Sequence, residues 1–242
     1  MSLGSWSVQP TLGGGATEIR VVARVARALR LDIVAVSQSG HSDSAIDDAA
    51  NFPESLAAAL AESPYVVLQS GHTTGLRDGW GDPGAPGFTT GDALLLRCDA
   101  DAGLTVVDVD AGSYAACRRA RSGWLAVDLE RAGARLRLVV THWDSRDIEV
   151  RAAQADELVK VATEYRGRVL LSVGGPAPTR GWLMNGVDDT MCDDPGLEAL
   201  VAAGFTDVSA MNAAVAGPST STPGAPHSTG EFRAETRPSA SA

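Results

Sequence analysis

The chain has 242 residues, 44% of them hydrophobic, and a formal net charge of -10 from 30 acidic and 20 basic side chains. This composition is typical of a soluble globular protein, and no run of roughly eighteen apolar residues predicts a membrane span. The acidic charge repels a polyanion, so generic nucleic-acid binding is disfavoured. The three cysteines are too few and too far apart for a disulfide framework.

The N-terminal third alternates strand-like and helical patterns. The sequence predicts strands near residues 6–8, 32–36 and 65–69, and a helix over 18–29 whose apolar residues recur every three or four positions. A second helix is predicted from the Asn51-Phe52-Pro53 start signal to about residue 61. The opening residues Met1-Ser2-Leu3-Gly4 lack the features of a secretion signal, so we expect a cytoplasmic protein.

The middle of the chain predicts four strands, at residues 92–97, 104–109, 124–127 and 135–141, which we interpret as one antiparallel meander. A helix over about 148–165, a buried strand at 169–173 and a helix at 197–203 follow. Residues 209–242 are rich in Ala, Ser, Thr, Pro and Gly and predict a flexible tail. We therefore expect one domain over residues 1–208 and a tail over 209–242.

Five short segments carry a resemblance to a known family. They are Trp6-Ser7, Val36-Ser37-Gln38, residues 91–97, Val140-Thr141-His142-Trp143 and Arg151-Ala152-Ala153-Gln154. In this order they resemble the Trp-Asn, Leu-Gln-Glu, Gly-Asn-Ala-(aliphatic)-Leu-Ser-Arg, Asn-Thr-His-Leu and Arg-x-x-Gln motifs of the endonuclease/exonuclease/phosphatase superfamily. The resemblance implies an α/β fold, the DNase I-like four-layer sandwich of two mixed β-sheets flanked by helices.

The same resemblance implies a divalent metal, Mg²⁺ or Mn²⁺, and a water activated by an Asp, but the chain differs at the residues that perform this chemistry. Gln38 replaces the metal-binding Glu and offers a neutral carbonyl oxygen to a cation that prefers carboxylates. Ser7 replaces an Asn, and Gly174 or Gly175 replaces the Asp that acts as general base. We therefore expect weak metal binding at Gln38, and no general base at that strand end.

The C-terminal part departs from the family pattern as well. Family members continue with an Arg-Ile-Asp-Tyr-like strand and close with Ser-Asp-His, whereas His227 of this chain is followed by Ser228 and has no Asp before it. The sequence therefore resembles a degenerate and C-terminally incomplete member of the superfamily.

The best-matched motif provides the main site candidates. His142 corresponds to the family's phosphate-binding His and is the candidate catalytic and ligand-binding residue, although a His bonded into the scaffold is the alternative. Asp92 replaces an Asn and adds a charge that would partly compensate for Gln38, so it is the second catalytic candidate. Ser7 and Trp143 are further ligand-binding candidates by the same resemblance.

Two other groups of residues have competing interpretations. Asp144 and Asp147 precede the helix at 148 and are better explained as helix caps than as catalytic residues. His41 and His72 fall in predicted loops and would form a new metal site with His142, although histidines scattered over separate loops are usually unrelated.

These observations favour a non-hydrolytic or strongly attenuated scaffold that binds a phosphate-bearing small molecule or another ligand. The alternative is an active divalent-metal-dependent phosphodiesterase or nuclease with a rearranged active site that uses His142 and Asp92. A third reading is a chain with no selected function, for which low stability would be expected.

Overall fold

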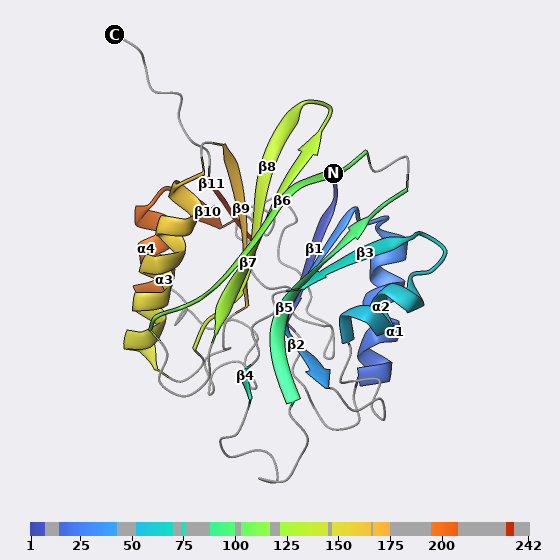
Figure 1. Cartoon of the computed structure of the whole chain (residues 1–242), viewed down its shortest axis with the longest axis horizontal. Coiled ribbons are helices and arrows are strands. Elements are labelled where there is room, and N and C mark those ends of the chain that lie inside the picture. The colour runs from blue at the N-terminus through green and yellow to red at the C-terminus, as the bar shows by residue number, and fades with distance from the viewer. Residues whose placement is uncertain are drawn as a thin grey trace, which may run out of the picture.

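The computed structural model describes residues 1–7, 15–42, 52–69, 74–75, 88–99, 103–116, 122–144, 147–165, 167–174, 195–207 and 231–234. In the described residues, helices and strands alternate toward both ends of the chain, and a run of consecutive strands lies between them (Figure 1). The elements are β1 Leu3–Ser7, α1 Gly15–Ala28, β2 Ile33–Ser42, α2 Phe52–Ala59, β3 Tyr65–Gln69, β4 Thr74–Gly75, β5 Phe88–Arg97, β6 Thr105–Ser113, β7 Gly123–Arg131, β8 Ala134–His142, α3 Ile148–Thr163, β9 Arg168–Gly174, α4 Pro195–Ala202, β10 Phe205–Asp207 and β11 Glu231–Ala234.

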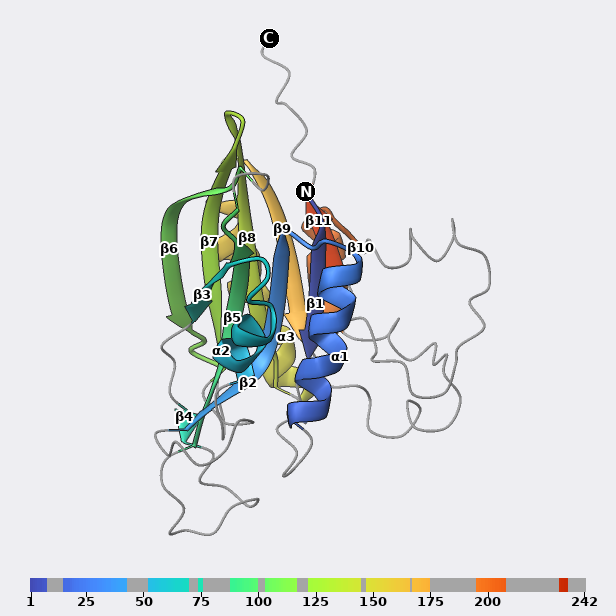
Figure 2. The same cartoon turned by 90° about the vertical axis from the view of Figure 1, so that its right-hand side faces the viewer.

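The strands of the described residues form two mixed sheets. The first sheet has the order β1-β2-β5-β3, with β4 also paired to β5, and the second has the order β10-β11-β9-β8-β7-β6. The pairs β1–β2 and β8–β9 are parallel, while β2–β5, β6–β7 and β7–β8 are antiparallel. Both parallel pairs run toward the lower end of the views in Figures 1 and 2, so their carboxyl ends meet at one end of the molecule.

The sheets and helices stack in the layers that the resemblance implied. Figures 1 and 2 show α1 and α2 on the outer face of the first sheet and α3 and α4 on the outer face of the second. One core cluster lies between α1, α2 and the first sheet, a second lies between the sheets, and a third lies between the second sheet and α3 and α4. The expected α/β four-layer sandwich is therefore confirmed.

The structure corrects two expectations. Strand β5 belongs to the first sheet, so the predicted four-strand meander contains only β6, β7 and β8. The range expected to be a flexible tail contains β11, which pairs with β9 and β10. Composition did not predict this strand, because Glu231-Phe232-Arg233-Ala234 is short and surrounded by small polar residues. The rest of 209–242 lies outside the described residues.

A buried ion pair lies at the end of the sandwich opposite the carboxyl ends of β2 and β8. Arg97, at the end of β5, donates to Asp32 at 2.6 Å, and both residues are under 9% exposed. Burial by itself would raise the pKa of Asp32, but the Ser2 backbone N–H and the neighbouring cations outweigh it and lower this pKa. The pair therefore joins the start of β2 to the end of β5.

None of the helices in the described part of the chain is long and apolar enough to cross a membrane.

Candidate functional site

Alternation along the strands places three polar side chains between the two sheets. On β5, Leu94 and Leu96 contact the core between the sheets while Ala93 and Leu95 contact the helical side, so Asp92 faces the second sheet. The same period places Ser37 of β2 on the face of Ile33 and Ala35, and His142 of β8 on the face of Leu138 and Val140. The middle of β2, the middle of β5 and the end of β8 thus direct Ser37, Asp92 and His142 toward the space between the sheets.

The register brings these strand positions together within each sheet. Ala93 pairs with Val36, and the pairing shifts between Val36 and Ser39, where Gln38 lies. A β-bulge at this point changes which way the following side chains face. On the other sheet His142 pairs with Gly174, the last residue of β9.

A buried hydroxyl chain lies on the face of the second sheet that packs against α3. Tyr114 follows β6, is 3% exposed, and its hydroxyl lies 2.7 Å from Oγ1 of Thr141, which donates to the carbonyl of Gly123 at 2.8 Å. Burial raises the pKa of Tyr114, hydrogen bonds from Thr141 and Trp143 lower it, and the nearby Asp92 carboxylate raises it. The net shift is upward, so Tyr114 is a neutral phenol at neutral pH and serves as a hydrogen-bonding group rather than a base.

His142 is held in its neutral form. The residue is half-buried, but its Nδ1 atom is fully enclosed. Burial lowers the pKa of His142 to about 4, although the carboxylate of Asp144 acts in the opposite direction. At neutral pH this imidazole therefore donates or accepts a hydrogen bond but carries no charge to attract a phosphate.

The segment that carries His142 is fixed by the first turns of α3. Gln154 is 0% exposed; its Oε1 accepts from the backbone N–H of Asp144 at 2.8 Å. Its Nε2 donates to the carbonyl of Ala116 at 2.9 Å and to Oγ of Ser122 at 2.7 Å. One side chain thus joins the end of β8 to the connection between β6 and β7, which contains Tyr114.

Other residues of α3 reinforce this connection. Glu157 accepts the backbone N–H groups of Ala115 and Ala116 at 3.0 and 3.2 Å, and Arg151 donates to the Asp144 carbonyl at 3.0 Å. Asp147 is the N-cap of α3, and its own N–H donates to Asp144 Oδ1 at 2.9 Å. The capping interpretation is confirmed for Asp147, whereas Asp144 supports the N-cap residue rather than the helix itself. The Arg-x-x-Gln motif has a structural role in positioning the site.

The structure describes the side chain of Trp143 but not those of the remaining site candidates, Ser7 and Gln38. Trp143 is 2% exposed and packs in the core between the second sheet and α3, so its indole occupies a packing position. The backbone of Ser7 pairs with that of Ser37 at the end of β1. The side chains of Ser7, Gln38 and His41 lie outside the described residues, as do His72, Gly175 and His227.

The structure adds four residues to the site and its support. Ser37, Thr141 and Gln154 lie within the motifs that carry the resemblance but were not predicted as site residues, and Tyr114 lies in none of these motifs. Ser37 is 2% exposed, and its Oγ has no hydrogen-bond partner among the described residues. A buried hydroxyl without a partner is uncommon, so its position between the sheets is suited to contact with a small polar ligand or a water. The sequence did contain a signal for Ser37: it follows Ala35 by two residues, and this spacing places both on the same face of β2.

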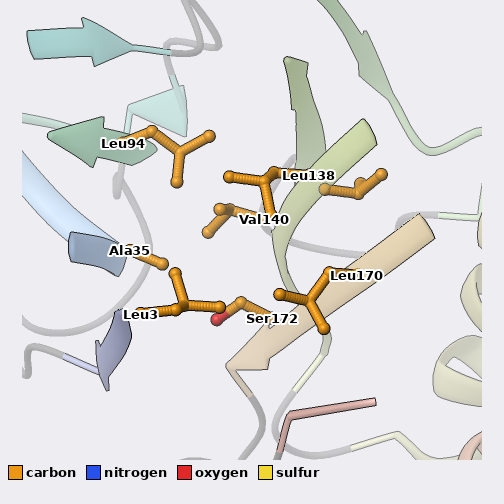
Figure 3. A pocket seen from close by; sticks show the side chains of 8 residues that line it. Leu3, Ala35, Leu94, Leu138, Val140, Leu170 and Ser172 are labelled. Carbon is orange, nitrogen blue, oxygen red and sulfur yellow. The ribbon is translucent and has the colours of Figure 1, made fainter. Parts of the chain in front are cut away.

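A small interior space lies deeper between the sheets. Its lining is apolar except for Ser172 and comes from both sheets (Figure 3). The lining residues are Leu3, Ala35, Leu94, Leu138, Val139, Val140, Leu170 and Ser172. These side chains offer no acid, base or metal ligand, so the space is a packing feature and the candidate site is the cluster of Ser37, Asp92 and His142 beyond it.

The donor set near His142 does not fit a tight magnesium site. Mg²⁺ requires an octahedron of oxygen atoms in which carboxylates supply the protein's charge. Asp144 already accepts the N–H of Asp147, and the part of the chain that the structure describes contains no group of three His, Cys, Asp or Glu placed to hold a metal. No step through a metal is therefore derived for these residues.

Comparison with solved structures identifies the fold class. The endonuclease/exonuclease/phosphatase family protein from Leptotrichia buccalis superimposes with a TM-score of 0.64 at 14% identity, covering 97% of this chain and 88% of that one. The corresponding protein from Beutenbergia cavernae gives 0.65 at 15% identity and covers 96% and 63%. D. rerio TDP2, solved with a single strand DNA product, gives 0.58 at 15% identity and covers 98% and 86%.

The chain therefore has the DNase I-like fold of the endonuclease/exonuclease/phosphatase superfamily, in agreement with the resemblance of its motifs. No protein-family model and no curated protein matches its sequence. At 14–15% identity the likeness establishes the fold, and the functional argument depends on the residues of the site.

Proposed function

We propose that this protein is a non-hydrolytic or strongly attenuated member of the fold that binds a phosphate-bearing small molecule between the sheets, near Ser37 of β2, Asp92 of β5 and His142 at the end of β8. The observation that carries the proposal is the pairing of His142 with Gly174. The strand position beside the histidine has no side chain, and the resemblance assigns the general base to Gly174 or Gly175. A water molecule at this point would have no carboxylate at that strand end to remove its proton.

The polar groups that remain are suited to hydrogen bonding. The neutral imidazole of His142 and the buried hydroxyl of Ser37 each provide a donor or an acceptor on the face between the sheets. Asp92, 4% exposed, adds a carboxylate that prefers a hydroxyl or amine over an anion. This mixture supports a ligand with sugar or alcohol hydroxyls next to a phosphate, and a cytoplasmic location remains part of the proposal.

The test has a binding arm and a hydrolysis arm. Binding of a nucleoside monophosphate is measured by calorimetry for the unaltered protein and for His142→Gln, with Gln69→Ala on the exposed end of β3 as the control. We expect binding that weakens about tenfold in His142→Gln, the loss of roughly one hydrogen bond to a ligand, and is unchanged in the control. Absence of binding in the unaltered protein contradicts the proposal.

The hydrolysis arm addresses the alternative of an active metal-dependent phosphodiesterase, which the fold of the solved neighbours favours. A chromogenic phosphodiester is incubated with millimolar Mg²⁺ or Mn²⁺ and the protein. The proposal predicts turnover at the background rate. Turnover above background that disappears in His142→Ala, while the circular dichroism spectrum is unchanged, would establish the active alternative in its place.

A further inference from the structure

The outward face of α1 carries a row of arginines. Arg20, Arg24 and Arg27 are exposed, and their spacing of four and three positions aligns them along one side of the helix. Arg30, also exposed, follows the end of the helix, and the four residues are called the arginine row. The opposite side of α1 packs on the first sheet through buried apolar residues, namely Ile19, Val22, Ala23 and Ala26. Figure 2 shows α1 at the front of the molecule, with its outer side toward the viewer.

Among the described residues, no acidic side chain pairs with this arginine row, and none of its four guanidinium groups forms a salt bridge. Arg20 donates to Oγ1 of Thr17 and Arg27 donates to the carbonyl of Ala23, each at 3.3 Å, but both acceptors are neutral. The row is therefore a local concentration of positive charge in a chain whose net charge is -10.

The last arginine occupies a backbone conformation that disfavours it. Arg30 follows the end of α1 with φ 48°, where the N–H of Leu31 donates to the carbonyl of Ala26 at 3.0 Å. Glycine is the usual residue at such a left-handed helix end, and a side chain there costs about 1 kcal/mol. An arginine at this position extends the row by one more charge at the expense of stability.

The length of the row fits a linear polyanion. From Arg20 to Arg27 the helix rises about 10 Å, at about 1.5 Å per residue, and Arg30 lies beyond its end. Each strand of a DNA duplex carries a phosphate about every 3.4 Å of helix axis, so the row is long enough to contact more than one phosphate of a backbone. We propose that the arginine row of α1 is a docking surface for the phosphate backbone of a nucleic acid, separate from the candidate site between the sheets.

A membrane surface fits these observations less well. Helices that lie in a membrane interface insert their apolar side, and the apolar side of α1 is buried against the first sheet. The overall acidic charge weakens binding at long range, but charges beyond about 10 Å are screened at roughly 0.1 M salt, so the row dominates contacts made directly with it. The surface therefore binds in contact with the backbone and without base readout.

The experiment compares two double variants with the same change in charge. Arg24→Gln/Arg27→Gln removes two charges from the row, and Arg135→Gln/Arg168→Gln removes two exposed arginines from the second sheet. Binding of a fluorescent DNA duplex is measured by anisotropy over a range of salt concentrations. Gln is a good helix former, so the α1 variant is expected to fold, and the control changes two exposed side chains of strands, which usually has little effect on stability.

Two lost phosphate contacts reduce the slope of log K against log salt by about 1.8 and weaken binding about 60-fold at roughly 0.1 M salt. We expect this result for the α1 variant and an unchanged slope for the control. Equal effects in both variants, or no binding of DNA by the unaltered protein at low salt, would overturn the proposal. So would binding to phosphatidylserine vesicles but not to DNA.

Arg30→Gly separates docking from a structural role. The left-handed conformation favours glycine, so this variant is expected to unfold at a higher urea concentration while its affinity for DNA falls by about eightfold at roughly 0.1 M salt. A gain in stability with unchanged DNA affinity would show that Arg30 contributes nothing to docking. DNA binding at the arginine row is measured independently of ligand binding and hydrolysis at the site between the sheets. The docking proposal and the proposed function can therefore fail separately.

Discussion

The side chain of Gln154 is predicted to be the main support of the candidate site. Gln154→Met keeps the length and buried volume of the side chain but removes hydrogen bonds to Asp144, Ala116 and Ser122. A buried polar group that loses its partner costs about 1–3 kcal/mol, and partial access of water to these groups places the total near 3 kcal/mol. For a chain of this size that corresponds to a fall of roughly 6–12 °C in Tm.

The assay is urea unfolding followed by tryptophan fluorescence, with a thermal scan as a second measure. Gln69→Met is the matched control because Gln69 is exposed and bonds only to the side chain of Glu54 among the described residues. The control is expected to change the free energy of unfolding by less than about 0.5 kcal/mol. If Gln154→Met changes the free energy of unfolding as little as the control does, Gln154 does not hold the two segments together, and its proposed role as the support of the site is wrong.

Three further changes follow from buried groups elsewhere. The pKa of His142 is lowered from 6.5 to about 4, so the unfolded chain takes up a proton that the folded chain does not, and stability falls as the pH decreases from about 6.5 to 4. His142→Gln should remove up to about 3 kcal/mol of this decrease, as measured by urea unfolding at pH 7 and pH 4; parallel pH curves for the two proteins would contradict it. Asp32→Asn removes the nearer carboxylate partner of the buried Arg97, which keeps Asp99 at 3.3 Å, and should destabilise the fold by about 3 kcal/mol. The double variant Asp32→Leu/Arg97→Met should cost less, and a loss of stability equal to the sum of the two single losses would refute this. Gly112→Ala would place a methyl group on the ring of Trp124 and should cost about 1–3 kcal/mol with a change in tryptophan emission, and a neutral effect would show that the ring moves freely.

The layers of the fold were predictable because short motifs and period-two strands occur in one fixed order. Residues 65–69 were predicted as a strand with the bounds that β3 has, and the strand at 169–173 agrees with β9 to within a residue at each end. Assignment of β5 to the first sheet was missed, since consecutive strands in sequence usually pair and no local pattern marks a change of sheet. Strand β11 was missed because its pairing with β9 comes from tertiary contacts.

The candidate site was only partly visible in the sequence. His142 and Asp92 were found because they lie in motifs, and the structure places both on the face between the sheets. Tyr114 and Gln154 contribute through contacts between residues 27 or more positions apart, namely with Thr141 and with Ser122 and Ala116. Local sequence carries no signal for such contacts. The lowered pKa of His142 likewise depends on burial, which a sequence motif does not specify.

The most direct test of the central claim is calorimetric titration of Mg²⁺ and Mn²⁺ into the EDTA-stripped protein, beside Gln38→Glu and the control Gln69→Glu. A scaffold that lost its metal chemistry by substitution predicts no binding by the unaltered chain or the control at millimolar metal, and measurable binding once Gln38→Glu supplies a carboxylate. Tight binding by the unaltered chain would contradict the account, because it would require a metal site that the described residues do not form.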